Sequence, residues 1–218
     1  DRFMQPVFVL LDETIGHMSG KAVLPTKEEV KEGIKLRKTF DGPASEYKPY
    51  ECDNDQPAVL NPMFKGYRYH FTGLHHDETG HPTEDEKKCD DLINRLFRKV
   101  ENHTDEIELN EEYMLDDAEI MIIAYGSMAL SVKEAVNRLR ADGIKVGMFR
   151  PITLWPSPAK RIKELCDKIQ KVLVTELNLG QYLEEIERVS GRRDFTTLFK
   201  ANGRPIAPIE IVEKVKGM

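Results

Sequence analysis

Polar residues that could contact a ligand follow an apolar run in the second half of the chain. Glu176 and Asn178 come at the end of the run Val172–Glu176 and are followed by Gly180 and Gln181. In open α/β sheets ligands bind at the carboxyl ends of the strands, so a carboxylate and an amide here are candidate ligand groups. An edge that docks against another domain or subunit would carry the same residues. The sequence leaves both interpretations open.

A second candidate is Ala124-Tyr125-Gly126-Ser127, where a predicted strand gives way to a predicted helix. Free N–H groups and the helix dipole at Gly126 and Ser127 can hold a phosphate. However, the chain has no G-x-G-x-x-G or G-K-[ST] pattern there, and no acidic residue ends the next strand to bind a ribose. A tight turn in which Ser127 caps the helix is the preferred interpretation. Arg150, at the end of that next strand, is expected at the same edge of the sheet.

The histidines His75, His76 and His81, with Asp77 and Glu78 between them, have the residue types of a metal site. Adjacent histidines point to opposite sides of an extended chain, and no helical H-x-x-x-H spacing makes these converge. A solvated loop with polar turn residues is therefore the better interpretation.

Near the N-terminus, Asp12, Glu13 and His17 are the remaining candidates. His17 is interpreted as a structural histidine rather than a general base. Asp12 and Glu13 are adjacent and do not face each other, so no acid/base pair follows from them. The chain shows no Ser-His-Asp order, nucleophile elbow or reactive-cysteine context. We therefore assign no catalytic, cofactor-binding or metal-binding residue from the sequence.

An ordered series of strands and helices must position the residues near Gly126 and Glu176. Apolar periodicity, with Gly143 and Gly191 as helix terminators and Ser157-Pro158 as an N-cap followed by proline, predicts this series. Short connections between alternating elements imply a parallel sheet with right-handed crossovers. The predicted strands are Ala118–Tyr125, Ile144–Phe149 and Val172–Glu176, and a final apolar stretch near Phe195–Phe199 and a last helix from about Pro208 complete the series.

The N-terminal half is less periodic. The apolar run Val7–Asp12 predicts a fully buried strand, and Thr26 with Glu29 has the spacing of a capping box. Residues Thr39–Pro82 predict an extended connector, partly β, with aromatic residues as packing surface. Thr83-x-x-Glu86 predicts the start of an amphipathic helix that runs to about Asn102.

A buried strand so close to the start of the chain has no earlier neighbours to pair with. A processed terminus, or a strand that pairs only with later segments, explains this. The alternative is that the chain is a fragment of a longer protein, and the sequence by itself leaves both open.

Composition excludes several classes of protein. The chain has 218 residues, 40% hydrophobic and 32% charged, as expected of a soluble globular protein. A formal net charge of −6 argues against a general nucleic-acid binder, and no apolar run is long enough for a membrane span. Three scattered cysteines without C-x-x-C exclude an iron–sulfur cluster built by this chain. With no signal peptide, a cytoplasmic location is expected.

Several motifs together resemble the α subunit of 2-oxoacid:ferredoxin oxidoreductases. They follow the family's order over nearly the whole chain, and the form Asp-Glu-Thr-Ile-Gly-His-Met is most similar to that of the 2-oxoglutarate members. The motifs are Pro6–Met18, Phe71–Gly80, Ala124–Ser127, Pro151–Pro156, Glu176–Gln181 and Asn202–Ile206.

The resemblance implies a domain organisation. Residues 116–218 would form an α/β domain like the C-terminal domain of transketolase. Residues 1–35 would be the tail of a thiamine-diphosphate pyrimidine-binding domain, and residues 36–115 an extended connector with a linker helix. The family's catalytic glutamate, threonine and arginine match no position here, so none is carried over.

The resemblance also implies a function at the level of a complex. Such a complex oxidatively decarboxylates a 2-oxoacid, here 2-oxoglutarate, to an acyl-CoA and passes the electrons to ferredoxin. It uses thiamine diphosphate, Mg²⁺, iron–sulfur clusters and coenzyme A, none of which this chain would bind alone. The partners would be a β subunit, with γ and δ subunits in some members, and no nucleic acid or membrane. This chain's own role would be structural and interface-forming.

Two alternatives remain open at this point. The first is a transketolase-C-like domain of another thiamine-dependent 2-oxoacid dehydrogenase. The second is a stand-alone module that binds a small anion at the Gly126/Asn178 edge.

Overall fold

The computed structural model describes residues 1–218 and divides into two compact units. One contains Asp1–Val9 with Ser19–Thr104, and the other contains Leu10–Met18 with Asp105–Met218. None of the helices is long and apolar enough to cross a membrane.

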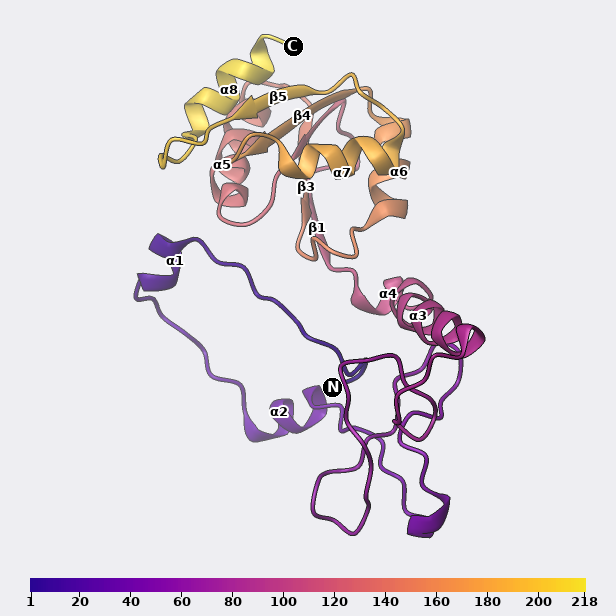
Figure 1. Ribbon diagram of the computed structural model, residues 1–218. Helices are drawn as coiled ribbons and strands as arrows, with labels where there is room; N and C mark the ends of the chain where they lie inside the picture. The colour runs from indigo at the N-terminus through magenta and orange to yellow at the C-terminus, as the bar shows by residue number, and fades with distance from the viewer. The chain divides into compact units, whose positions relative to one another are not determined.

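The second unit contains a five-stranded sheet in the order β1-β3-β2-β4-β5 (Figure 1). Four strands are parallel, as the alternation of strands and helices predicted. They are β2 (Ile120–Ile123), β3 (Val146–Pro151), β4 (Lys171–Glu176) and β5 (Thr196–Phe199).

Strand β1 (Asn110–Tyr113) was not predicted, and it lies antiparallel to β3 at one edge of the sheet. Its sequence, Asn-Glu-Glu-Tyr, is polar because its residues are exposed or only half-buried. Four residues with so little apolar content give no strand signal in the sequence.

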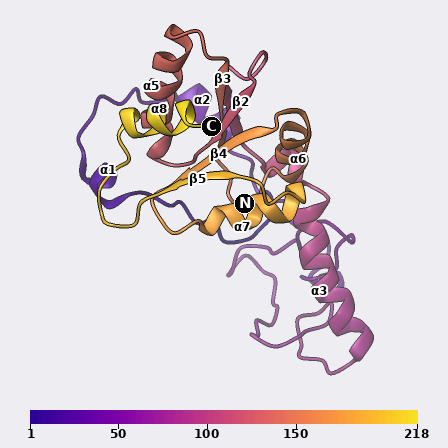
Figure 2. The same ribbon diagram turned by 90° about the horizontal axis from the view of Figure 1, so that it is seen from above.

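Helices cover both faces of the sheet. Figure 2 shows α5 (Met128–Ala141) and α8 (Pro208–Lys216) on one side of the strands, with α6 (Ala159–Lys168) and α7 (Gln181–Ser190) on the other. The helices follow the predicted segments, and α5 and α7 are followed by Gly143 and Gly191 in the left-handed conformation. The α/β fold class predicted from the sequence is confirmed for this domain.

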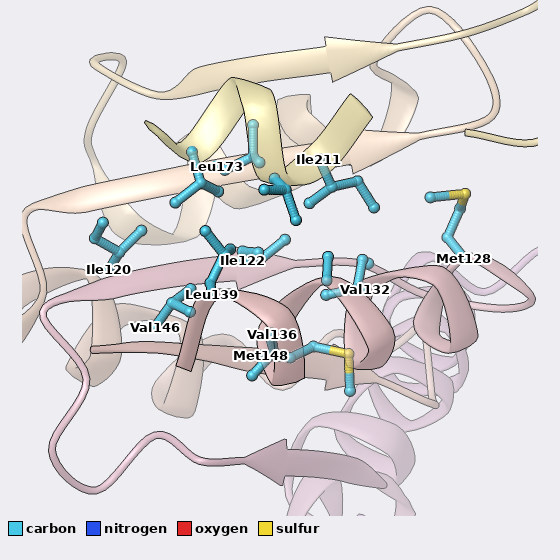
Figure 3. Packing of buried hydrophobic residues seen from close by; sticks show 14 of the residues in the cluster. Ile120, Ile122, Met128, Val132, Val136, Leu139, Val146, Met148, Leu173 and Ile211 are labelled. Carbon is cyan, nitrogen blue, oxygen red and sulfur yellow. The ribbon is translucent and has the colours of Figure 1, made fainter. Parts of the chain in front are cut away.

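Two hydrophobic clusters hold the three layers together. On the α5 side, Ile122 and Leu173 of the sheet pack against Val132, Val136 and Leu139 of α5 (Figure 3). On the other side, side chains of alternate residues in the same strands pack with α6 and α7, among them Met121, Ile123, Val172 and Val174. Alternation along each strand therefore decides which helix pair a residue contacts.

The first unit has little regular structure. It contains α2 (Lys27–Gly33), a short 3-10 helix at Ala44–Glu46, and α3 (Glu86–Glu101). The predicted capping box of α2 is present: Glu29 N–H donates to Thr26 Oγ1 at 3.2 Å, and Thr26 N–H donates to Glu29 Oε2 at 2.7 Å.

The segment Thr39–Pro82 is extended, as predicted, but its only β pairing is an isolated bridge between His76 and Pro82. Its packing centre is the buried Asn61, whose side-chain amide exchanges two hydrogen bonds with the backbone of Phe40 at 2.7 and 2.8 Å. The Tyr47 hydroxyl accepts from the Asn61 N–H at 2.8 Å. The aromatic rings around it, Phe40, Tyr47, Tyr67 and Tyr69, contact one another.

The prediction of a buried strand at Val7–Asp12 is wrong for this structure. The run has no strand partner, and Val7, Phe8 and Val9 are 81%, 85% and 79% exposed. An apolar sequence favours a strand only where a neighbouring strand supplies hydrogen bonds, and no segment of this chain does so here. The nearby α1 (Glu13–His17) is likewise exposed.

Two predicted helix starts are also displaced. Helix α3 is capped by Asp85, whose carboxylate accepts from the Lys88 N–H at 2.9 Å, and not by Thr83. Helix α6 begins at Ala159 after an uncapped Pro158, because the Ser157 hydroxyl donates instead to Glu185. The carboxylate of Asp85 thus replaces the predicted Thr83 cap of α3, and the predicted cap of α6, Ser157, bonds to Glu185 of α7 instead. The short α4 (Thr104–Ile107) was not predicted.

The packing of α5 predicts that two leucines of this helix contribute very differently to stability. Leu139 is fully buried and Leu130 is 70% exposed on the same helix. Leu139→Ala should lower the free energy of unfolding by about 2–5 kcal/mol, because it leaves a cavity in the core. Leu130→Ala should change it by less than about 0.5 kcal/mol. Urea unfolding of both variants measures this, and equal losses would contradict the placement of α5.

Candidate functional site

The carboxyl ends of β2 and β4 bring three polar side chains together. Tyr125 follows β2, and Glu176 and Asn178 end and follow β4. The Tyr125 hydroxyl donates to Glu176 Oε2 at 3.0 Å, and Asn178 Nδ2 donates to the Tyr125 hydroxyl at 2.8 Å. Glu176 and Asn178 thus lie in one network, joined by Tyr125 of the second candidate motif, to which no role was assigned from the sequence.

Glu176 is almost completely buried, at 1% exposure, and its charge is met by the start of α7. Tyr182 N–H donates to Oε2 at 3.0 Å and Leu183 N–H donates to Oε1 at 2.9 Å. Both N–H groups belong to the first turn of α7, where helical N–H groups lack partners in the helix itself. The helix dipole adds a favourable field for a negative charge. Glu176 is therefore a structural carboxylate whose oxygens are already used.

Asn178 completes the turn from β4 into α7. Its Oδ1 accepts from Gly180 N–H at 2.7 Å and from Gln181 N–H at 2.9 Å. Gly180 has φ +98°, and a Cβ added to it would lie 2.6 Å from the ring of Phe199. Only glycine fits this turn without strain. The N-terminus of α7 is consequently filled by the chain's own side chains.

Tyr125 remains a neutral donor at physiological pH. Burial, and next the negative charge of Glu176, raise the pKa of Tyr125 to about 12. Its ring contacts that of Tyr182 in an edge arrangement, with centroids 5.3 Å apart. Burial also raises the pKa of the Tyr182 phenol.

Arg150 lies at the end of β3 but takes no part in this network. Its Nη1 donates to Glu111 Oε2 of β1 at 3.1 Å, and Glu111 also pairs with Lys133 of α5. The two cations lower the pKa of the Glu111 carboxyl, with the Lys133 hydrogen bond as the largest cause. This cluster attaches the edge strand β1 to β3 and α5.

The turn from β2 into α5 differs from the turn into α7. Gly126 has φ +59° and Ser127 occupies the N-cap position, as predicted, but the Ser127 side chain makes no capping hydrogen bond. The predicted cap at Ser127 is therefore wrong, although the turn is in the predicted place. A pocket of about 210 Å³ opens beside this turn, lined also by Asp12 and Thr175.

The remaining candidates from the sequence lie elsewhere. His76 contacts the ring of Tyr50, with centroids 4.0 Å apart, and His81 stacks on His70. No three His, Cys, Asp or Glu side chains converge as metal ligands would. His17 and Glu13 form an exposed pair on α1.

Comparison with known proteins shows which family this domain resembles. Residues 118–211 match the family model described as pyruvate:ferredoxin oxidoreductase core domain II. These residues contain every parallel strand and both turns described above. This part of the chain is therefore similar to core domain II of this family.

The similarity extends beyond core domain II. The chain is 36% identical over its full length to the 2-oxoglutarate synthase subunit KorA of Methanothermobacter marburgensis, and covers 58% of that subunit. It is 39% identical to the KorA of Methanocaldococcus jannaschii, again over its full length, and covers 57% of it. The resemblance to α subunits of 2-oxoacid:ferredoxin oxidoreductases is confirmed, for a chain that spans somewhat more than half the length of these relatives.

A solved structure agrees with this assignment. The 2-oxoglutarate:ferredoxin oxidoreductase from Magnetococcus marinus, with 2-oxoglutarate, coenzyme A and succinyl-CoA bound, matches with a TM-score of 0.76 and 28% identity. The match covers 89% of this chain and 34% of the other.

The donor groups of this chain do not fit the cofactors of such complexes. Cys52 and Cys89 belong to the first unit and Cys166 to the second, where Cys166 lies in the core. Burial raises the pKa of the Cys166 thiol to about 11, so it is not a thiolate ligand at neutral pH. The two carboxylate oxygens of Glu176 already accept hydrogen bonds from the chain itself. Neither an iron–sulfur cluster nor a Mg²⁺–diphosphate centre is built from these residues.

Sequence reasoning named Tyr125 only as part of a motif, without a role, and missed Thr175. Both are polar groups at the ends of apolar strands, and each has a hydroxyl that must find a partner when buried. A hydroxyl residue at the carboxyl end of a predicted parallel strand was the available signal.

The network predicts that the Tyr125 hydroxyl stabilises the fold. Tyr125→Phe removes a donor to a buried carboxylate and should lower the free energy of unfolding by about 1–3 kcal/mol. Tyr113→Phe is the matched control, because its hydroxyl donates to Asn137 at the surface; it should cost less than about 1 kcal/mol. Urea unfolding at neutral pH measures both losses. An unchanged midpoint for Tyr125→Phe would show that the Tyr125 hydroxyl does not stabilise the fold.

The raised pKa of Tyr125 predicts a dependence on alkaline pH. The folded state favours the neutral phenol, so the stabilisation is complete below the unfolded pKa of about 10 and is lost as pH rises towards about 12. The difference in unfolding free energy between the wild type and Tyr125→Phe should therefore shrink over this range. Other tyrosines are common to both proteins and cancel in the difference. A constant difference would show that folding does not raise the pKa of Tyr125.

Proposed function

We propose that this chain is the C-terminal part of the α subunit of a 2-oxoacid:ferredoxin oxidoreductase whose substrate is 2-oxoglutarate. The observation that carries the proposal is similarity along the full length of the chain to subunits named 2-oxoglutarate synthase subunit KorA. The relative solved with 2-oxoglutarate bound supports the same substrate.

In this proposal the chemistry belongs to the whole complex. The complex converts a 2-oxoacid to its acyl-CoA with loss of CO₂ and passes electrons to ferredoxin. Thiamine diphosphate, Mg²⁺ and iron–sulfur clusters are held by other parts of the complex, including a β subunit and, in larger assemblies, γ and δ subunits. Core domain II contributes a rigid body and interfaces.

The proposed domains are residues 1–35 as the tail of a pyrimidine-binding domain, 36–115 as connector and linker helix, and 116–218 as core domain II. The exposed run from Val7 to Leu11 supports the assignment of the first segment to a domain that is otherwise outside this chain. Five consecutive apolar side chains are more than 70% exposed there. Such a patch marks a surface that another part of the protein covers. A β-branched run of this kind suits a central strand of a parallel sheet.

Assembly tests the proposal. The native gene product, tagged at its C-terminus, should be captured from its source cells with a subunit that contains iron and thiamine diphosphate. The eluate should reduce ferredoxin when 2-oxoglutarate and coenzyme A are added. Phe8→Asp should abolish recovery of the partner, because the charge lies in the strand proposed to be buried.

Phe64→Asp is the matched control for Phe8→Asp. Phe64 is 98% exposed and Phe8 is 85% exposed, but Phe64 lies outside the proposed strand. It should leave recovery of the partner unchanged. Capture of the tagged chain without a redox subunit, or equal recovery for both variants, would contradict the proposal.

A further inference from the structure

The pocket beside the α5 turn lies at a special place in the sheet. Strands β2 and β4 are parallel neighbours, but the helix after β2 packs on one face and the helix after β4 on the other. The two chain turns therefore diverge and leave a crevice between them. In open α/β sheets this topological switch point is where ligands bind. We refer to the pocket lined by Asp12, Tyr125–Met128 and Thr175–Asn178 as the switch-point pocket.

The two sides of this crevice differ in how far their polar groups are satisfied. On the α7 side, Glu176 and Asn178 accept all the N–H groups of the turn that they face. On the α5 side, no side chain caps the helix. Helix α5 has 14 residues, so its first turn presents free N–H groups and the positive end of a full-length dipole.

A second, independent observation points to a ligand. Thr175 lines the switch-point pocket, is fully buried, and its hydroxyl has no hydrogen-bond partner. It lies two residues after Leu173 along β4, and residues i and i+2 of a strand share a face, so Thr175 lies on the face covered by α5. A buried hydroxyl without a partner costs free energy, so valine would be the more stable residue here. Its hydroxyl is explained by a partner that enters the pocket.

The groups that remain available determine the class of ligand. With the oxygens of Glu176 and Asn178 in use, the pocket offers the first N–H groups of α5 and the hydroxyls of Ser127 and Thr175. These are hydrogen-bond donors beside a positive helix end, and they suit anionic oxygens. Tyr125 is a neutral phenol, because its pKa is raised.

We propose that the switch-point pocket binds a small oxyanion, a carboxylate or phosphate group, between the N-terminus of α5 and the Thr175 hydroxyl. The group has two possible sources. One is a free or ligand-borne oxyanion. The other is the carboxylate of Asp12, which lines the same pocket and belongs to the same compact unit. The proposal concerns residues of core domain II and does not depend on the substrate of the complex.

Titration with inorganic phosphate tests the proposal. The amide resonances of Gly126, Ser127 and Met128 in the Asp12→Asn variant of the 218-residue chain should shift and saturate at millimolar phosphate. Thr175→Val should weaken binding about tenfold or more, since a hydrogen bond to a charged group is lost. Thr175→Ser keeps the hydroxyl and should retain binding. Thr175→Val should unfold at the same or a higher urea concentration, which shows that lost binding is not lost folding.

A second arm distinguishes the two sources. If the Asp12 carboxylate occupies the pocket, phosphate should bind only after Asp12→Asn, and acetate should compete with it. If the occupant is a free oxyanion, wild type and Asp12→Asn should both bind. The proposal is overturned if neither protein shows saturable shifts at Gly126–Met128, or if Thr175→Val binds phosphate as tightly as Thr175→Ser.

Discussion

A buried negative charge at the end of β4 is the constraint on which the rest of this domain depends. Glu176 is almost completely buried, and a buried carboxylate must be paired or hydrogen-bonded. The first turn of α7 and the hydroxyl of Tyr125 meet that need. These hydrogen bonds attach the start of α7 to the end of β4 and, through Tyr125, link the ends of β2 and β4.

Satisfying this charge makes the sheet edge asymmetric. The α7 side of the switch point is closed by the protein's own oxygens, whereas the α5 side keeps its helix end and the hydroxyl of Thr175 unpaired. Natural proteins retain costly features of this kind mainly where they serve binding. The same edge thus explains both a well-ordered turn into α7 and a set of hydrogen-bond donors beside α5 without partners in this chain.

Most of the parallel sheet could be predicted from the sequence, because apolar runs such as Val172–Glu176 alternate with amphipathic helices closed by glycines. β1 could not be, since Asn110–Tyr113 is polar and is held by Glu111, which pairs with Arg150 and Lys133. For the site, Glu176 and Asn178 were selected by position, but their role depends on Tyr125 and on N–H groups that only the fold brings near. For Val7–Leu11 the sequence predicted burial and the structure shows exposure. An apolar run is buried only where another surface covers it, and no segment of this chain covers this run.

Amide hydrogen exchange tests most directly whether the N–H groups at the start of α7 are hydrogen-bonded while those at the start of α5 are not. The N–H groups of Tyr182 and Leu183 should exchange slowly, at a rate set by opening of the core, because they donate to buried Glu176. In Asp12→Asn, those of Ser127 and Met128 should exchange much faster and become protected when phosphate is added. Equal protection of both turns without phosphate, or no protection when it is present, would contradict the account.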